Sequence, residues 1–399
     1  MKIGDKFQCT IESVAFGGDG VARVENMVVF IPFVLPGETV IAKIRTIKRD
    51  YLRARAVEIL TASPERITPV CPLYNRCPGC VYQHSSFKEE QEIKLSQLKQ
   101  LLHGVVEMEN ITASTAVTPE NALHYRNKIV LHTLKDHGET LLGYVGRDVS
   151  ETVDVKNCPL ACQAINDELA VQRNKPGFDH SIHAGMDVTF RYTPANGVLM
   201  WRNNPPKNLS WLKEELPFGC MSVPAGSFTQ VNPVGMKALV ELLQAEIKRM
   251  APEKVIDAYC GAGLFGLAAG LAGAAQIVAV EADEAAVQAA NYNFKQYNLA
   301  DHAVAHAGDA GDELSELLID FPESGVLIVD PPRGGLTPKV RAVSIRSNLK
   351  RMIYISCNPS TLNRDLHTLE SGGFKVVKCV MINMFPRSSH FEVFTVLER

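Results

Sequence analysis

The chain has 399 residues, more than one domain usually holds, so two or three domains are expected. With 46% hydrophobic and 21% charged residues and no apolar run long enough for a membrane span, the composition is typical of a soluble globular protein. The first residues lack the apolar segment of a secretory signal, so a cytoplasmic location is expected. The net charge of −3 does not indicate nucleic-acid binding, which would require a local basic patch.

Residues 1–60 are predicted to form a small OB-like β-barrel, because short apolar runs alternate with glycine-rich turns. Between Lys43 and Arg55 there are six basic residues, one acid and the aromatic Tyr51. This composition fits contact with an RNA backbone, since phosphates attract cations and bases stack on rings. It fits equally well a solvated edge strand that its charges protect from aggregation.

Residues 61–225 are predicted to form a central, mostly β domain, because short alternating runs predominate and helix signals are few. One amphipathic helix is expected at residues 86–104, with an apolar side able to pack on the C-terminal domain. Tyr125-Arg126-Asn127-Lys128 begins a strand. Arg126 and Lys128 are cations suited to phosphate groups, although the same residues also make an ordinary strand start of mixed polarity. We favour the phosphate contact.

Four cysteines of the central region have the spacing of a ligand set: Cys71, Cys77, Cys80 and, far downstream, Cys158. Disulfides are rare in a reducing compartment, so metal ligands are expected among the ten cysteines. Four thiolates suit either a tetrahedral zinc ion or a 4Fe-4S cluster, and the spacing does not choose between them. Cys162 is an alternative to Cys158 as the fourth ligand.

Residues 226–399 are predicted to form a doubly wound, Rossmann-like α/β domain. Helices are expected at residues 234–250, 264–272 and 284–297, and strands at residues 254–258, 276–281, 303–307, 325–330 and 351–356. Gly261 and Gly263 follow the first strand, where glycines let the backbone approach a ligand. Glu281 ends the second strand, where a carboxylate can bind a ribose diol, and Asp309 follows the third. This spacing favours S-adenosylmethionine over a dinucleotide.

Cys357 and Glu392 are the candidate catalytic residues. Asp330 and Cys357 each follow a buried strand, which places them at the ligand-binding edge of the sheet. A thiolate at this edge can add to C6 of a uracil, which makes C5 nucleophilic enough to accept a methyl group. The C5 proton must then leave, and Glu392 is the candidate base. Taken singly, Cys357 is an ordinary buried cysteine and Glu392 a surface acid; their combination favours catalysis.

These motifs resemble those of the bacterial RNA (uracil-5-)-methyltransferases, particularly the ribosomal RNA members with an N-terminal TRAM domain, over nearly the whole chain. The resemblance implies that Cys357 is the nucleophile and Glu392 the base. It also implies a set of residues around the methyl donor or target base: Gln230, Tyr259, Glu281, Asp309 and Asp330. Phe228, in the same loop as Gln230, is then a stacking surface for a flipped uracil. For the four cysteines, the resemblance implies a 4Fe-4S cluster.

The resulting prediction is a monomeric enzyme that uses S-adenosylmethionine to methylate C5 of a specific uridine, in 23S ribosomal RNA, with transfer RNA as the alternative substrate. One rival is an amino-methyltransferase, in which an aromatic residue follows an Asp/Asn-Pro-Pro motif. Here Arg333 follows the prolines, and that reaction has no use for Cys357 and Glu392. The other rival is an RNA-binding iron–sulfur scaffold with an inactive methyltransferase fold, against which the intact candidate residues argue.

Overall fold

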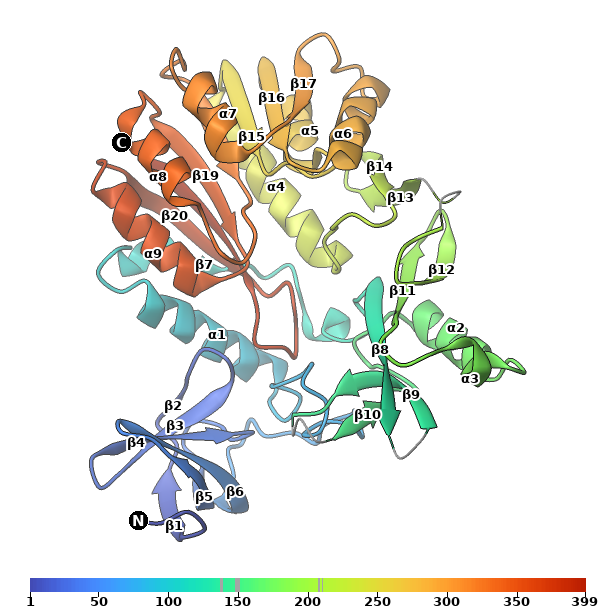
Figure 1. Cartoon of the computed structure of the whole chain (residues 1–399). Coiled ribbons are helices and arrows are strands. Elements are labelled where there is room, and N and C mark those ends of the chain that lie inside the picture. The colour runs from blue at the N-terminus through green and yellow to red at the C-terminus, as the bar shows by residue number, and fades with distance from the viewer. Residues whose placement is uncertain (137–138, 148–150, 207–208, 210) are drawn as a thin grey trace.

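The computed structural model describes residues 1–136, 139–147, 151–206, 209 and 211–399. Figure 1 shows three regions that follow one another along the chain: a small N-terminal β-structure, a central β-rich region and a large C-terminal α/β region. No helix among these residues combines the length and apolar character that a membrane crossing requires.

The N-terminal region is a six-stranded sheet in the order β1-β5-β6-β4-β3-β2. Its strands are β1 (Lys6–Thr10), β2 (Ser13–Val14), β3 (Asp19–Val24), β4 (Met27–Pro32), β5 (Thr39–Ile47) and β6 (Tyr51–Thr61). Alternate residues of β5 point inward, so that Val40, Ala42 and Ile44 are buried in a core of their own. Glu25 and Asn26 join β3 to β4 with positive φ values of 48° and 66°, which a tight two-residue hairpin turn requires.

Helix α1 (Phe87–Leu101) joins the barrel region to the C-terminal region. Ser86 caps it by accepting a hydrogen bond from the backbone N–H of Glu89 at 3.1 Å. Leu98 and Leu102 are buried against α9 (Pro359–Glu370) and its neighbours in the C-terminal core. Two short 3-10 helices, Met108–Asn110 and Pro119–Asn121, flank β7 (Ile111–Ala113), which pairs in parallel with β20 (Lys375–Ile382). A strand from the middle of the chain therefore extends the C-terminal sheet.

The central region contains an antiparallel sheet in the order β10-β9-β8-β11-β12 and a separate hairpin, β13-β14. The strands are β8 (Lys128–Asp136), β9 (Glu139–Val145), β10 (Thr152–Asp154), β11 (Asp187–Thr193), β12 (Gly197–Arg202), β13 (Trp211–Leu216) and β14 (Gly219–Pro224). Helices α2 (Gln163–Arg173) and α3 (Phe178–Ser181) accompany the sheet. The sequence analysis did not predict α2, because its buried apolar side consists of little more than Ile165 and Leu169.

The C-terminal region is built on an eight-stranded sheet in the order β17-β16-β15-β18-β19-β21-β20-β7. Its own strands are β15 (Lys254–Ala258), β16 (Gln276–Glu281), β17 (Ala303–Ala307), β18 (Val326–Val329), β19 (Arg351–Ser356), β20 and the antiparallel β21 (Glu392–Glu398). Helices α4 (Pro233–Met250), α5 (Leu264–Leu271) and α6 (Glu284–Gln296) cover one face. The other face is covered by α7 (Ala310–Leu317), α8 (Pro338–Arg346), α9 and α1.

This arrangement agrees with the predicted doubly wound fold. The strands predicted at residues 254–258, 276–281, 303–307 and 351–356 have those bounds in the structure. The predicted helices at residues 234–250, 264–272 and 284–297 each differ by one residue at one end. Neighbouring strand residues such as Val255 and Ile256 belong to the cores on opposite faces, which explains the continuous apolar strands of this part of the sequence.

Candidate functional site

Three strand ends bring Asp330, Cys357 and Glu392 to the same edge of the large sheet. β18 and β19 run parallel, with Val329 paired to Tyr354, so the residues that follow them emerge side by side. β21 runs antiparallel to β19, and Ser356 pairs with Val393. Cys357 and Glu392 therefore stand opposite each other one position further on. This carboxyl edge is where open α/β sheets bind their ligands.

The local sequence fixes Cys357 between a buried strand and a capped helix. Met352 to Ser356 are buried, whereas Cys357 is partly accessible. Asn358 then caps α9 by accepting a hydrogen bond from the backbone N–H of Ser360 at 3.2 Å, and Pro359 occupies the first turn of the helix. The thiol is thus held at the sheet edge by rigid elements on both sides.

Burial and mutual repulsion favour the protonated forms of the acidic groups at this edge. Burial raises the pKa of the Cys357 thiol to about 11, with further contributions from the charges of Glu392 and Asp330, while Arg333 opposes the shift. The pKa of Glu392 is raised well above its usual range by burial and by Asp330, and burial raises the pKa of Asp330 to about 7. Strongly shifted groups that converge on one edge are typical of a functional site.

A cavity of about 70 Å³ lies beside these residues, at the loop between β15 and α5. It brings together four residues of the predicted cofactor site: Gln230, Tyr259, Gly261 and Asp330. Within the described part of the chain, Gln230 Oε1 and the Tyr259 hydroxyl are buried without a hydrogen-bond partner. Tyr259 also has a φ of 66°, a strained backbone conformation for a non-glycine residue. Unpaired polar groups and backbone strain both point to a bound ligand here.

The remaining residues that were predicted to bind the cofactor do not line this cavity, but they stabilise the loop and helices next to it. Glu281 accepts hydrogen bonds from the backbone N–H groups of Gly261 and Asp283, both at 3.0 Å, and so holds the glycine loop. Asp309 caps α7 through one carboxylate oxygen, at 2.8 Å from the backbone nitrogen of Gly311. Gly263 has a φ of 88°, which favours glycine, and a Cβ there would also lie in tight contact, 3.0 Å from the Ala290 Cβ.

A buried ion pair that was not predicted from the sequence reaches the cavity from the central region. Arg191 of β11 is fully buried and pairs with Glu214 of β13, and it donates a hydrogen bond to Thr229 Oγ1 at 2.9 Å. Both Glu214 and Thr229 line the cavity. The sequence feature that could have indicated this pair is the alternation Leu212, Glu214, Leu216, which places an acidic residue on the buried side of β13.

The three residues predicted to contact the substrate occupy different environments. Phe228 lines the cavity and is 75% exposed, so its ring is free to stack. Lys128 lies near Arg191 and Glu214, and burial, followed by Arg191, lowers its pKa. Arg126 lines a second cavity, formed by the cysteines, and its Nε has no hydrogen-bond partner among the described residues.

Cys71, Cys77, Cys80 and Cys158 line this second cavity, which has a volume of about 250 Å³. Cys162 does not belong to its lining and is the N-cap residue of α2. Gln83 connects two of these cysteines: it donates a hydrogen bond to Cys80 Sγ at 3.2 Å and accepts one from the Cys71 N–H at 3.0 Å. Within the described ranges, however, no three His, Cys, Asp or Glu side chains come close enough to hold a single metal ion.

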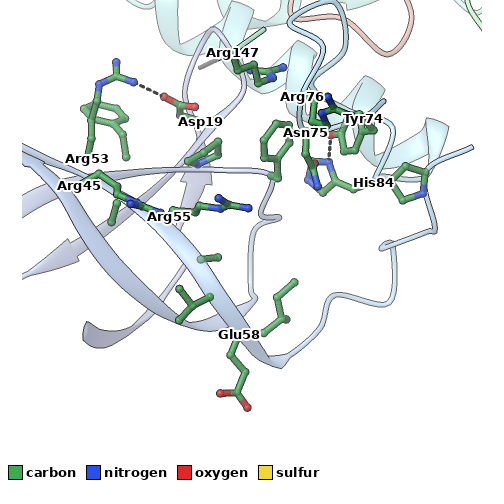
Figure 2. Close-up of a pocket in the computed structure, with 18 of the residues that line it drawn as sticks. Asp19, Arg45, Arg53, Arg55, Glu58, Tyr74, Asn75, Arg76, His84 and Arg147 are labelled. Atoms are coloured by element: carbon green, nitrogen blue, oxygen red, sulfur yellow. Dashed lines mark hydrogen bonds and ion pairs between the residues drawn. The ribbon is translucent and has the colours of Figure 1, made fainter. Parts of the chain in front are cut away.

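A groove of about 930 Å³ separates the barrel from the cysteine segment, and Figure 2 shows cationic side chains from both of its walls. Arg45, Arg53 and Arg55 come from β5 and β6. Arg76 and Arg147 come from the opposite wall. Arg147 lies 4.7 Å from the Phe33 ring centre and donates hydrogen bonds to the carbonyl oxygens of Cys77, at 3.2 Å, and Cys80, at 2.6 Å.

Comparisons with known proteins show that the chain is similar to RNA methyltransferases. Residues 219–399 match the tRNA (uracil-5-)-methyltransferase family, and residues 2–57 match the TRAM domain. An uncharacterized RNA methyltransferase of Caldanaerobacter subterraneus subsp. tengcongensis is 29% identical over 100% of this chain and 99% of its own length. Another, from Halalkalibacterium halodurans, is 28% identical over 99% of this chain and 97% of its own.

The fold as a whole is also found in a solved structure. The Pyrococcus abyssi tRNA (uracil-54, C5)-methyltransferase, crystallised with S-adenosyl-L-homocysteine, matches 98% of this chain and 100% of that chain with a TM-score of 0.74 and 21% identity. The match of residues 219–399 to the tRNA (uracil-5-)-methyltransferase family model, together with the relatives named as RNA methyltransferases, agrees with the resemblance drawn from the sequence.

Proposed function

We propose that this enzyme methylates C5 of a specific uridine in RNA through a transient covalent bond between Cys357 and C6 of the uracil. The observation that carries the proposal is the register of β19 and β21: Ser356 pairs with Val393, so Cys357 and Glu392 follow at the same edge of the sheet, next to the cavity that Asp330 lines. A nucleophile and a base thus share one edge with a candidate cofactor pocket, as this chemistry requires.

S-adenosylmethionine is the methyl donor that we propose for the cavity at the glycine loop. The unpaired Gln230 Oε1 and Tyr259 hydroxyl fit a polar ligand, and the outer edge carries Glu281 and Asp309 for a ribose and adenine. When bound, this donor supplies an electrophilic methyl group on a positively charged sulfur. Asp330 lines this cavity, so a positive charge bound in it would favour the ionised form of the Asp330 carboxyl group.

The residues of the chain then account for each proton and bond. The Cys357 thiolate adds to C6 of the uracil, which turns C5 into a carbon nucleophile that takes the methyl group. The Glu392 carboxylate removes the remaining proton from C5, and the electron pair of that bond expels the Cys357 thiolate from C6. Elimination thus restores the Cys357 thiolate, and the Glu392 carboxylate is restored when it gives the C5 proton to water.

Phe228 is the residue that we propose stacks on the target base. A uracil inside a folded RNA cannot reach a thiol at the sheet edge unless it leaves its stack, and stacking on an exposed aromatic ring offsets part of the free energy that this costs. Phe228 is 75% exposed and lies at the mouth of the cofactor cavity, next to Thr229 and Gln230.

The groove of Figure 2 supplies the phosphate contacts in this proposal. Three arginines of the barrel face Arg76 and Arg147 across it. The whole lining contains six arginines and three acidic residues, so the local charge is positive although that of the whole chain is not. The edge-strand interpretation of the basic stretch explains neither the second cationic wall nor the concave shape. RNA binding is therefore the better account of Arg45 and Arg55.

For the cysteine cavity we propose a 4Fe-4S cluster held by Cys71, Cys77, Cys80 and Cys158. A tetrahedral zinc ion needs Zn–S distances of about 2.3 Å and so draws four sulfur atoms within about 4 Å of one another. The four cysteines line one cavity of about 250 Å³. Four thiolates suit either group, and the resemblance drawn from the sequence is the reason for preferring the iron–sulfur cluster. Because Cys158 lines the cavity and Cys162 does not, Cys158 is the better candidate for the fourth ligand.

Two classes of RNA are candidate substrates. The resemblance of the N-terminal region to that of the ribosomal RNA enzymes favoured 23S ribosomal RNA as the substrate, and we keep it as one candidate. The Pyrococcus abyssi transfer RNA enzyme, however, has the same fold over 98% of this chain, so a barrel of this kind does not separate the two substrates. Transfer RNA is the second candidate. Sequencing both RNA classes from a deletion strain identifies the uridine that loses its methyl group.

The covalent step is tested with RNA that contains 5-fluorouridine at the target position. Fluorine cannot leave as a proton does, so the enzyme, its methyl donor and this RNA should form an adduct that survives denaturation. Cys357→Ala should abolish the adduct, whereas Cys220→Ala, at an exposed cysteine of β14, should leave it unchanged. Normal methylation by Cys357→Ala would overturn the scheme.

A further inference from the structure

The loop of residues 383–391 leads directly into Glu392. It connects β20 to β21 and is closed by the pairing of Ile382 with Glu392. Glu392 Oε2 is buried without a hydrogen-bond partner in the described part of the molecule. Because no hydrogen bond from the described residues holds this oxygen, the position of the carboxylate depends on the backbone at the start of β21 and on the loop that leads into it.

Helix α1 holds the loop through a buried ion pair. Glu90 and Lys94 are both 0% exposed and lie 2.8 Å apart. Lys94 Nζ also donates hydrogen bonds to Asn383 Oδ1 at 2.8 Å and to the Phe385 carbonyl oxygen at 3.2 Å. Glu90 Oε1 accepts hydrogen bonds from Asn383 Nδ2 at 3.0 Å and from the Arg387 N–H at 2.9 Å. Each charge of the pair therefore binds the loop.

The segment that follows the cysteines holds the middle of the loop. The N–H groups of Val81 and Tyr82 donate hydrogen bonds to the Arg387 carbonyl oxygen at 2.8 and 3.1 Å. Arg387 Nη1 donates a hydrogen bond to the Ser85 carbonyl oxygen at 2.8 Å. Arg387 has a φ of 68°, a strained value that persists only where the surroundings impose it.

The barrel contributes Phe16, from the loop between β2 and β3. Its ring meets His390 and Phe391 edge-on, with centroid distances of 6.5 and 5.9 Å. Gln97 of α1 fixes this barrel loop by donating hydrogen bonds to the Val14 and Ala15 carbonyl oxygens at 3.0 and 2.9 Å. Figure 1 shows α1 between the barrel and the large sheet, where it can bind both.

We infer that Phe16, Glu90 and Lys94 are positioning residues for Glu392: they hold the loop of residues 383–391 where the carboxylate can reach the C5 proton. The inference rests on the proposed covalent mechanism. It gives the barrel a second role besides RNA contact, since Phe16 touches the two residues immediately before the base. None of the three residues lines the cofactor cavity.

Phe16→Ala is the decisive variant, because Phe16 is only partly buried and packs against the C-terminal core from outside rather than forming part of it. With ordinary RNA, we expect methyl transfer in a single turnover to stay near the parent rate and the methylated covalent adduct to persist. Misplacing the base by a fraction of an ångström should lower kcat about tenfold. Phe7→Ala removes a barrel ring that packs only within the barrel, and it should not make the adduct persist.

Lys94→Met is the second variant. It preserves the length of the side chain but leaves Glu90 with Arg387 at 3.3 Å, so its folding must be checked by circular dichroism. A folded Lys94→Met should accumulate the same adduct. Release of product at the parent rate by Phe16→Ala, or equal adduct lifetimes in Phe16→Ala and Phe7→Ala, overturns the inference. If the parent itself forms no adduct with 5-fluorouridine RNA, the covalent mechanism has failed instead.

Discussion

Cys357 and Glu392 stand opposite each other because β19 and β21 pair in one particular register, Ser356 with Val393. They are 35 positions apart in the sequence, and an antiparallel partner strand returns Glu392 to the thiol. A slip of one residue would turn every side chain of β21 to the other face of the sheet. Burial of β21 from Glu392 to Leu397 on both faces opposes such a slip.

Glu392→Gln should separate methyl transfer from product release. The amide cannot remove the C5 proton, but Cys357 can still add to C6, so the methylated adduct should accumulate on ordinary RNA. Denaturing electrophoresis with labelled RNA measures it, and the double variant Glu392→Gln with Cys357→Ala is the control that must show none. Rapid turnover by Glu392→Gln would remove this residue from the role of base.

The rate of methylation should rise with pH. Catalysis needs the thiolate of Cys357 and the carboxylate of Glu392, and burial raises the pKa of both groups, to about 11 for Cys357. Raised pKa values deplete both active forms near neutral pH, so single-turnover rates should increase from about pH 6 to about pH 9.

Arg333→Gln provides the control for this pH dependence. Arg333 lowers the pKa of both Cys357 and Glu392. Without it, both pKa values should rise further, and the profile should move to higher pH. A rate that does not change over this range, or a shift to lower pH in Arg333→Gln, would contradict the assigned protonation states.

Arg45→Gln and Arg55→Gln should weaken RNA binding and reduce its dependence on salt. Each lost phosphate contact should lower the slope of log Kd against log salt concentration by about one, while the affinity for S-adenosylmethionine stays unchanged. Arg346→Gln, at an exposed arginine at the end of α8, should change neither quantity. Equal salt slopes in all three variants would mean that the groove does not bind the RNA backbone.

The cysteine cavity should hold iron. Protein purified without oxygen should be brown and contain iron and sulfide, measured by visible absorption and elemental analysis. Cys80→Ser should lose the iron, whereas Cys162→Ser should keep it, because Cys162 lies outside the lining of the cavity. A colourless protein with one zinc ion, or loss of iron in Cys162→Ser alone, would show that the ligand set is wrong.

Much of the C-terminal region was predictable because its signals are local. Apolar runs such as Val326–Val329 end at Asp330, and Gly261 and Gly263 follow β15, so strands, turns and strand-end residues can be read in order. α2 and the Arg191–Glu214 pair escaped prediction. The first has too short an apolar side to show a helical period, and the second joins residues on separate strands.

The sequence by itself determined the chemical groups: a cysteine and an acid at strand ends, a glycine loop, four spaced thiols and a basic β-region. Only the tertiary structure decided which of them meet. Strand register put Glu392 opposite Cys357, and the barrel and cysteine segment together formed the groove. α1 forms hydrogen bonds both with the barrel loop that carries Phe16 and with the loop of residues 383–391, and Phe16 contacts Phe391. The physical reason is that local sequence sets backbone preference and polarity over a few residues, whereas contacts between distant segments follow from how the buried faces pack.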